Sequence, residues 1–180
     1  ASTNPILQEH ARPILIDSDR TTWNIDPNLL SDFLSRRARD NRLPKAVMAV
    51  HLFGQPAAID DLVSICTRYG VTLIEDAAES LGSSYKGQHT GTFGRVGVLS
   101  FHGNKTITTG GGGAILTNDP EMARRAKHIT TTAKLPHAWE YRHDEVGYNY
   151  RMPNINAALG CAQLEQLSTK LASKRELLRR

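Results

Sequence analysis

The sequence is poor in cysteine, in aromatic residues and in long apolar runs. Its 180 residues include 2 cysteines, and aromatic side chains make up 6% of the chain. Two isolated cysteines without a CxxC pair argue against a disulfide scaffold and a thiolate metal site, and they favour a reducing, cytoplasmic location. No apolar run approaches the roughly 18 residues of a transmembrane helix, and we expect neither a signal peptide nor a membrane segment.

Most of the chain also lacks an excess of charge of either sign. The net charge is +4, yet the first 150 residues balance at 16 basic and 16 acidic side chains, so the excess lies in residues 151–180. There, in STKLASKRELLRR, charges mix with leucines at helical spacing, which is typical of a solvated helix face. The charge pattern therefore predicts no nucleic-acid partner.

Strand and helix patterns alternate along the chain, as in an α/β domain. Both ends read as cut: the opening already lies inside this pattern, and the closing KRELLRR lies within a helix that has no stop signal. We therefore expect a fragment. The patterns predict a strand over 13–19 ending near Asp17, a helix over 24–40 entered through Asp26 and Pro27, a buried strand over 45–54, a helix over 57–70 ended by Gly70, and a buried strand over 71–76.

Two further strands are expected over 96–101 and 113–119, and a helix follows from Pro120. About a dozen residues separate these two strands, and a parallel crossover normally takes that many or more and usually carries a helix. We therefore predict that the connection is a loop between antiparallel neighbours in a mostly parallel, mixed sheet.

Polar residues follow two of the expected strands. Asp76 ends one strand, Ser100 ends another, and Lys105 comes five residues later. Alone, such an aspartate is usually a cap or turn residue, and such a lysine is usually exposed. Ligands of open α/β sheets bind at the carboxyl ends of the strands. Together the residues meet the needs of pyridoxal 5'-phosphate, which requires a lysine amine for a Schiff base, a carboxylate at the ring nitrogen and donors for the phosphate.

The stretch SFHGNKTITTGGGGA, residues 100–114, fits no common nucleotide motif. A Walker A loop requires GxxxxGK[ST], but Asn104 separates Gly103 from Lys105. The dinucleotide fingerprint GxGxxG fails because no third glycine stands at 115 or 116. The four glycines leave two interpretations open, a flexible turn or a loop that lets the backbone approach a ligand.

The stretches 75–119 and 147–167 resemble the DegT/DnrJ/EryC1/StrS family of sugar aminotransferases, and the likeness extends over most of the chain. The resemblance implies a three-layer α/β sandwich with a mostly parallel mixed sheet, the large domain of the fold-type-I pyridoxal-phosphate enzymes. It also implies that residues 1–150 form an N-terminally incomplete cofactor-binding domain. Residues 151–180 then begin an interdomain helix toward an absent small domain.

The resemblance also implies roles for single residues. Lys105 matches the lysine that holds the cofactor and moves the proton, Asp76 matches the partner of the ring nitrogen, and Ala78 matches the small residue packed against the ring. Glu79 stands where relatives carry Gln, His or Glu near the ring hydroxyl.

Three more residues complete this implied site. Ser100 and Asn104 match phosphate ligands, and Asn149 matches an asparagine that reaches the phosphate from the partner subunit of a homodimer. Two positions depart from the family pattern. His102 stands where many relatives carry Tyr or Phe, and Gly111 stands where many carry Glu.

The function implied is amino transfer from L-glutamate to a nucleotide-linked ketosugar of the 4-keto-6-deoxy type, in the biosynthesis of amino sugars or of cell-surface polysaccharide such as lipopolysaccharide. The alternative is a non-catalytic truncated core, or a regulatory or structural dimer partner. A sugar dehydratase of the family would carry His in place of Lys105.

Other conspicuous residues have structural interpretations. His51, at the end of a strand, is expected to be a satisfied structural histidine, and Trp23 and Trp139 are expected to be packing residues. His137 and His143 lack the spacing of a metal site.

Overall fold

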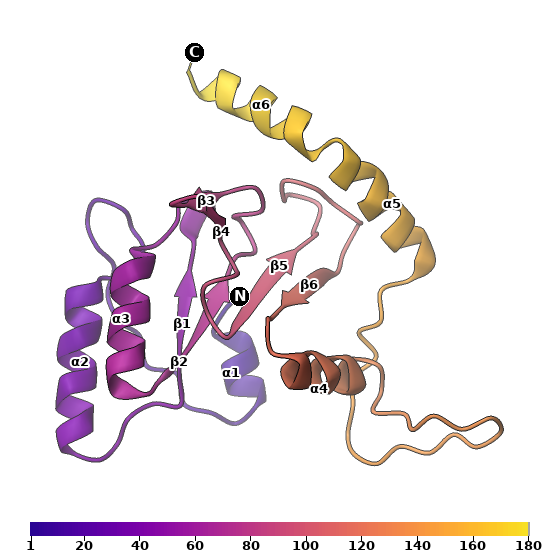
Figure 1. Ribbon diagram of the computed structural model, residues 1–180, viewed down its shortest axis with the longest axis horizontal. Coiled ribbons are helices and arrows are strands. Elements are labelled where there is room, and N and C mark those ends of the chain that lie inside the picture. Colours follow the sequence, from indigo (N-terminus) through magenta and orange to yellow (C-terminus); the bar gives the residue numbers. More distant parts are fainter. Residues whose placement is uncertain (180) are drawn as a thin grey trace. The chain divides into compact units, whose positions relative to one another are not determined.

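The computed structural model describes residues 1–179, which fold into two compact units, Ala1–Leu99 and a second one from Ser100 on. Figure 1 labels the elements along the chain. The first unit contains α1 (Asn4–Gln8), α2 (Pro27–Arg39), β1 (Ala46–Val50), the short 3-10 helix η1 (Leu52–Gly54), α3 (Ile59–Tyr69), β2 (Thr72–Asp76), β3 (Ser84–Tyr85), β4 (Gln88–His89) and β5 (Val96–Ser100), whose last residue opens the second unit. The second unit continues with β6 (Gly113–Leu116), α4 (Pro120–Thr130), α5 (Asn154–Glu165) and α6 (Leu167–Leu178).

The sheet of the first unit is parallel. β1 pairs with β2 in a register that sets Val50 opposite Asp76, and β2 pairs with β5 so that Asp76 lies opposite Val98. The carboxyl ends of these strands therefore meet at one edge of the sheet. This arrangement confirms the predicted succession of a strand, a helix and a second strand over residues 45–76, and it brings Asp76 to the edge where α/β proteins bind ligands.

Helix boundaries follow from local capping chemistry. The carboxylate of Asp26 accepts hydrogen bonds from the first N–H groups of α2, and that of Asp119 does the same for α4. Each cap is followed by proline, whose missing N–H costs nothing at a first helical position. Gly70 ends α3 with φ +63°, in the left-handed region that glycine adopts freely. All three predicted boundaries are confirmed.

The hydrophobic core lies between the sheet and two helices of the first unit. Figure 1 shows α2 and α3 side by side along one flank of β1 and β2. The cluster of buried apolar side chains joins these four elements and consists of Leu30, Leu34, Val47, Ala49, Ala57, Leu62, Ile65, Cys66, Val71 and Leu73. This core fixes the strand ends that carry the polar residues.

The strand predicted over 13–19 is wrong. This segment makes only a single antiparallel bridge between Ser18 and Ile25, and Ile14 and Leu15 are exposed. Its β-branched and apolar residues favour an extended backbone, but a strand also needs a neighbour to pair with. No strand of residues 1–179 runs along it.

A small hairpin that was not predicted lies in the connection between β2 and β5. β3 and β4 pair antiparallel around Lys86 and Gly87, which have φ +49° and +85°. Positive φ at both central residues matches the twist that two-residue hairpin turns require.

In the second unit, the chain after β5 folds back before it enters β6. The Phe101 N–H donates to the Gly112 carbonyl, and the Thr109 N–H donates to the Phe101 carbonyl. This pattern is the one expected for a connection between antiparallel neighbours.

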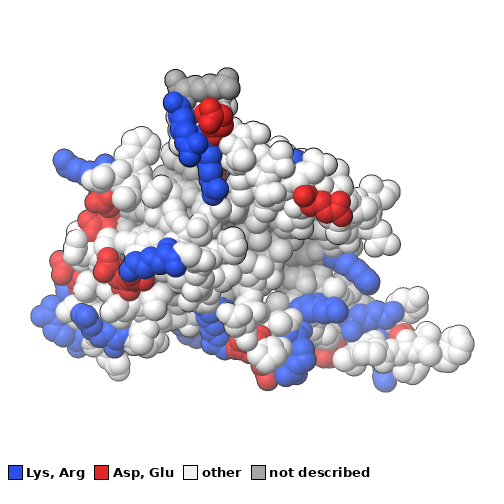
Figure 2. Space-filling model, turned by 45° about the horizontal axis from the view of Figure 1, so that its top comes forward, with Lys and Arg blue, Asp and Glu red and all other residues white. Residues whose placement is uncertain are grey.

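The last helix of the second unit, α6, has no buried residue. Among residues 1–179 no helix combines the length and the apolar content that a bilayer crossing requires. Figure 2 shows basic and acidic side chains interspersed on the face in view.

Candidate functional site

The first cluster of predicted site residues lies at the carboxyl end of β2. Asp76 ends that strand, and its side chain is half-buried. Its Oδ1 accepts the Ala78 N–H at 3.1 Å, and its Oδ2 accepts the Ser2 hydroxyl at 2.6 Å. Both of these partners are neutral donors. Because a carboxylate offers about four acceptor positions, Asp76 can take a further hydrogen bond from a cationic ring N–H.

Ala78 and Glu79 lie in the turn that leaves the sheet after Asp76. The Glu79 Oε2 accepts the backbone N–H of Phe53 at 2.9 Å. Phe53 belongs to the loop that follows β1, so this bond joins the loops after two neighbouring strands. The structure thus places Asp76, Ala78 and Glu79 at one edge of the sheet, at the end of β2 and in the turn that follows it.

The second cluster lies on the turn after β5, in the second unit. Ser100 ends the strand, and its Oγ accepts the His102 N–H at 3.3 Å. The Lys105 N–H donates to the His102 carbonyl at 3.0 Å, which closes the turn. Asn104 lies within it, with Oδ1 3.4 Å from the His102 ring Nδ1. Ser100, Asn104 and Lys105 are therefore carried by one tight turn.

The glycines that follow this turn adopt conformations closed to other residues. Gly110 has φ +77° and Gly112 has φ +93°. The Thr108 Oγ1 accepts the Gly110 N–H at 2.9 Å and itself donates to the Phe101 carbonyl. These hydrogen bonds give the loop a defined path, which favours the interpretation of a shaped loop over that of a flexible turn.

Asn149 lies on a different segment of the second unit, beside the end of α4. The backbone around it is held by hydrogen bonds from the Tyr148 N–H to the Ile129 carbonyl and from the Tyr150 N–H to the Thr130 carbonyl. The rings of Tyr148 and Tyr150 stack at 5.3 Å. Asn149 itself is exposed. In an extended segment the middle side chain points away from its two neighbours, so Asn149 faces the other side.

Sequence reasoning missed Glu75, which is 1% exposed. Its carboxylate accepts the backbone N–H groups of Gly91 at 2.8 Å, and of Phe93 and Gly94 at 2.6 Å each, and it binds the His51 ring at 3.0 Å. Burial alone would raise the pKa of Glu75, but these four hydrogen bonds together hold it below its ordinary value. A charged residue on the buried face of an apolar strand was the available signal.

His51 is a satisfied structural histidine, as predicted. It is fully buried, its Nδ1 accepts the Ala57 N–H at 3.1 Å, and its Nε2 faces Glu75. Because Nδ1 is an acceptor, the ring proton of the neutral imidazole sits on Nε2 and is donated to the carboxylate. His51 thus positions loops and contributes no open ligand atom.

The prediction that both tryptophans are packing residues is wrong. Trp23 is 62% exposed and Trp139 is 87% exposed. Trp23 follows a turn closed by Asp19 and has a φ of +61°. Tryptophan is usually buried for its large apolar area, and local sequence does not reveal a left-handed backbone.

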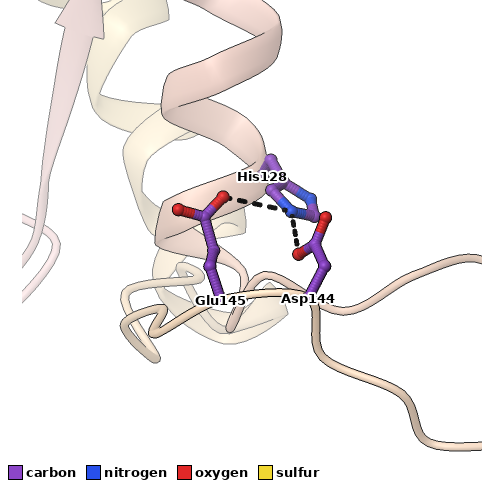
Figure 3. A group of neighbouring side chains, drawn as sticks. All are labelled: His128, Asp144 and Glu145. Atoms are coloured by element: carbon purple, nitrogen blue, oxygen red, sulfur yellow. Dashed lines mark hydrogen bonds and ion pairs between the residues drawn. The ribbon is translucent and has the colours of Figure 1, made fainter.

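Figure 3 shows a second group of polar side chains, in which His128 projects from α4 toward Asp144 and Glu145. The His128 Nε2 lies 2.7 Å from Asp144 Oδ1 and 3.6 Å from Glu145 Oε1. The two terminal nitrogens of the Arg125 guanidinium donate to the Glu145 carboxylate, Nη2 at 2.6 Å. Although three ligand types meet here, Arg125 already compensates the charge that a divalent cation would need. The group is an ion-pair network that fastens residues 144–145 to α4.

A parallel α/β sheet with polar residues after its strand ends is the arrangement in which open α/β proteins bind their ligands. The sequence model of the DegT/DnrJ/EryC1/StrS aminotransferase family matches residues 1–180, and the chain belongs to this family. The family resemblance and the α/β fold predicted from the sequence are thereby confirmed.

Three similar proteins illustrate the relationship. EpsN of Bacillus subtilis (strain 168), which carries the name of a pyridoxal phosphate-dependent aminotransferase, is 49% identical over 180 residues, covering 100% of this chain and 46% of EpsN. GDP-perosamine synthase of Escherichia coli O157:H7 is 42% identical over 177 residues, covering 98% of this chain and 47% of the synthase. The solved structure of Helicobacter pylori PseC, an aminotransferase involved in pseudoaminic acid biosynthesis, has a TM-score of 0.85 at 28% identity and covers 93% of this chain and 44% of PseC.

The chain spans about half the length of the curated relatives it matches. Its residues fit pyridoxal 5'-phosphate, the cofactor of the family, in the chemistry of their donor sets. Asp76 has acceptor positions of the kind that a ring N–H needs, the Ser100 turn carries a hydroxyl and an amide, and Lys105 carries a primary amine.

Proposed function

We propose that the protein carrying this chain transfers an amino group from L-glutamate to a nucleotide-linked sugar of the 4-keto-6-deoxy type, with pyridoxal 5'-phosphate as cofactor. The observation that carries the proposal is the presence of Asp76 at the end of β2 and of Lys105 on the turn after β5, in a chain of an aminotransferase family. The substrate class is supported by the relative named GDP-perosamine synthase.

In the proposed reaction, Asp76 and Lys105 have separate roles. Pyridoxal 5'-phosphate, when bound, supplies the electron sink that lets an amino group pass between carbon skeletons. Asp76 holds a proton on the ring nitrogen. Lys105 would hold the cofactor through its amine, and its Nζ would serve as general acid and base.

The turn after β5 is suited to a phosphate. Because the Ser100 Oγ accepts the His102 N–H, its own hydroxyl proton is directed to another acceptor, such as a phosphate oxygen. Asn104 adds an amide donor from the same turn. Ala78 would offer a small surface to the ring face, and Glu79 would meet the ring hydroxyl either as the neutral acid or through a shared proton, because two anionic oxygens would otherwise repel each other.

We further propose a homodimer in which Asn149 completes the phosphate site of the second copy. Its exposed side chain, on a backbone held by the end of α4, supports this role. We place the enzyme in the cytoplasm, consistent with two free cysteines, and its product in cell-surface polysaccharide such as lipopolysaccharide.

An absorbance titration tests the proposal. The purified protein is mixed with pyridoxal 5'-phosphate, and L-glutamate is then added. We expect a visible band that forms with the parent protein and disappears with glutamate, and that is absent from Lys105→Ala. Lys127→Ala, which removes an exposed lysine of α4, is the matched control and should behave like the parent. A band that forms equally well in Lys105→Ala would overturn the assignment.

Asp76→Asn separates cofactor binding from chemistry. The variant keeps the shape of the side chain but loses the charge that retains the ring proton. We expect the glutamate-dependent change to slow by about 100-fold or more while the cofactor still binds. An undiminished rate would contradict the role given to Asp76.

A further inference from the structure

Two large aromatic side chains of the first unit lie against each other in solvent. Trp23 is 62% exposed and Phe53 is 76% exposed, and their ring centroids are 6.4 Å apart with planes tilted by 59°. They come from segments that are distant in the sequence. Single exposed aromatics are ordinary, but a contacting pair forms a patch that calls for a ligand or a partner.

Both residues of this aromatic pair have a strained backbone. Trp23 has φ +61° and Phe53 has φ +54°. A bulky residue rarely adopts the left-handed region, because its Cβ crowds the backbone there. Such strain persists only where the surroundings fix it, and it tends to occur at functional sites.

One buried amide fixes both aromatic residues. Asn24, which directly follows Trp23, is 3% exposed. Its Nδ2 donates to the Gln55 carbonyl at 3.0 Å, and its Oδ1 accepts the Leu52 N–H at 2.9 Å. Asn24 therefore bridges the two residues that flank Phe53 and Gly54, and it ties them to the backbone beside Trp23.

Further bonds hold the loop of Phe53 to the candidate site. Glu79 accepts the Phe53 N–H, and the Ser83 Oγ donates to the Gly54 carbonyl at 2.7 Å. The loop is thus fastened on both sides, while the Phe53 ring remains outside. Through Glu79 the aromatic pair is joined to the residues at the end of β2, where the cofactor cluster begins with Asp76.

We infer that Trp23 and Phe53 form a stacking site for the planar base of the nucleotide-linked sugar. This inference rests on the proposed function and adds a recognition element to it. Two preorganised aromatic faces suit a nucleobase, since every base has a π-face and an ordered platform loses little entropy on binding.

The segment that leads into Trp23 carries charged side chains of both signs, Asp17, Asp19 and Arg20. Arg20 is exposed on the turn that Asp19 closes, in the segment that leads into Trp23. A cation there is compatible with the diphosphate of a nucleotide. The bond from Phe53 to Glu79 also makes the pair continuous with the proposed ligand site.

Fluorescence gives a direct test, because the chain has 2 tryptophans. In a Trp139→Phe background, Trp23 is the reporter. GDP and dTDP are titrated as probes, with ribose 5-phosphate and pyrophosphate as controls that lack a base. We expect saturable quenching of Trp23 by the nucleoside diphosphates and none by the controls.

Variants measured by calorimetric titration with GDP then separate stacking from folding. Trp23→Ala and Phe53→Gly should each raise the Kd by about 10-fold or more, and Phe53→Trp should preserve binding. Phe53→Gly should not lower the melting temperature, because glycine adopts this φ without strain. Tyr141→Ala removes a ring that is 81% exposed outside the pair, and it should change the Kd by less than about 2-fold.

The outcomes separate this inference from the proposed function. If glutamate reacts with the loaded protein but GDP neither quenches Trp23 nor distinguishes the variants, the stacking site is overturned and the proposed function stands. If GDP binding depends on Phe53 while glutamate does not react, the stacking site stands and the proposed function fails. A changed sedimentation coefficient in Trp23→Ala with unchanged GDP affinity would assign the pair to a contact between copies and overturn the inference.

Discussion

Two histidine–carboxylate pairs, one in each unit, have similar geometry and opposite surroundings. His51 and Glu75 approach to 3.0 Å with side chains 0% and 1% exposed, whereas His128 and Asp144 approach to 2.7 Å with side chains 26% and 46% exposed. Hydrogen-bond length alone would rank the second pair as the stronger. Because water screens exposed charges, the contribution of each pair to stability is decided by its burial.

The surroundings differ because the two units are built differently. In the first unit the core cluster of α2, α3, β1 and β2 excludes water around the carboxyl end of the sheet. In the second unit, α4 and α6 bury no residue and α5 buries only Gly160. The same type of pair therefore holds backbone N–H groups around a buried carboxylate in the first unit, and it attaches a surface segment to α4 in the second unit.

The largest expected effect is that of Glu75→Gln. The variant replaces an acceptor-only carboxylate by an amide whose NH₂ meets backbone N–H groups that need acceptors. We expect the free energy of unfolding at pH 7 to fall by about 3–5 kcal/mol, because the N–H groups lose a charged acceptor and each buried donor left unsatisfied costs about 1–3 kcal/mol. Urea unfolding measures it. Glu165→Gln, at an exposed position on α5, is the control and should leave the urea midpoint nearly unchanged.

The dependence of the free energy of unfolding on pH gives a second test of the role of Glu75. The pKa of Glu75 is lowered from 4.5 in the folded chain, so its contribution is fully present above about pH 4.5 and is lost as the pH falls through the folded value. The parent and Glu75→Gln should therefore converge in stability on acidification. Parallel curves for the two proteins would show that Glu75 does not carry this dependence.

The two units should also differ in the reactivity of their cysteine thiols, and this is the effect of intermediate size. Cys66 is buried in the core of the first unit and Cys161 is exposed, and burial raises the pKa of the Cys66 thiol to about 11. At pH 8 only about one Cys66 thiol in a thousand is ionised. We expect Cys66 in Cys161→Ala to react with Ellman's reagent at least about 100-fold more slowly than Cys161 in Cys66→Ala. Equal rates in the folded proteins would contradict the burial of Cys66.

The smallest expected effect is that of Asp144→Asn. Its hydrogen bond from His128 lowers the pKa of Asp144, so the interaction is present above the usual carboxyl range and is lost as the pH falls through the folded value. Exposed pairs contribute little to global stability, and we expect the urea midpoint to stay within error.

Local cleavage should still detect the loss of this pair. Chymotrypsin at neutral pH should cut the segment around Tyr141 faster in Asp144→Asn, and added salt should reduce the difference. Glu140→Gln, which removes the exposed pair with Arg142, is the matched control. A cleavage rate like that of the parent would show that the pair does not restrain the segment.

Local chemistry made much of the fold predictable. The caps at Asp26 and Asp119 and the stop at Gly70 depend on neighbours within a few residues, so their sequence patterns are sufficient. The segment 13–19 has the composition of a strand, but strand pairing is a property of two segments. The turn at Lys86 needs a positive φ in a residue that rarely adopts it.

The same distinction between local and tertiary interactions applies to the candidate site. The positions of Asp76 and Ser100 at strand ends, and of Lys105 on the turn after β5, could be predicted because strand patterns are local. Glu75 and Asn24 could not be assigned roles, since their partners are backbone groups brought near only by tertiary folding. Trp23 was mistaken for a packing residue because tryptophan is usually buried, and the sequence around it does not reveal its exposure.

The Glu75 carboxylate also has a consequence for the motions of the sheet. The amides of Gly91, Phe93 and Gly94 belong to a connection without regular ladder bonds, yet all three share one buried acceptor on β2. That connection cannot open by itself without stranding a buried charge. Its amide hydrogens should therefore exchange with solvent as slowly as those of the central strands, which makes loop and strand one cooperative unit of unfolding.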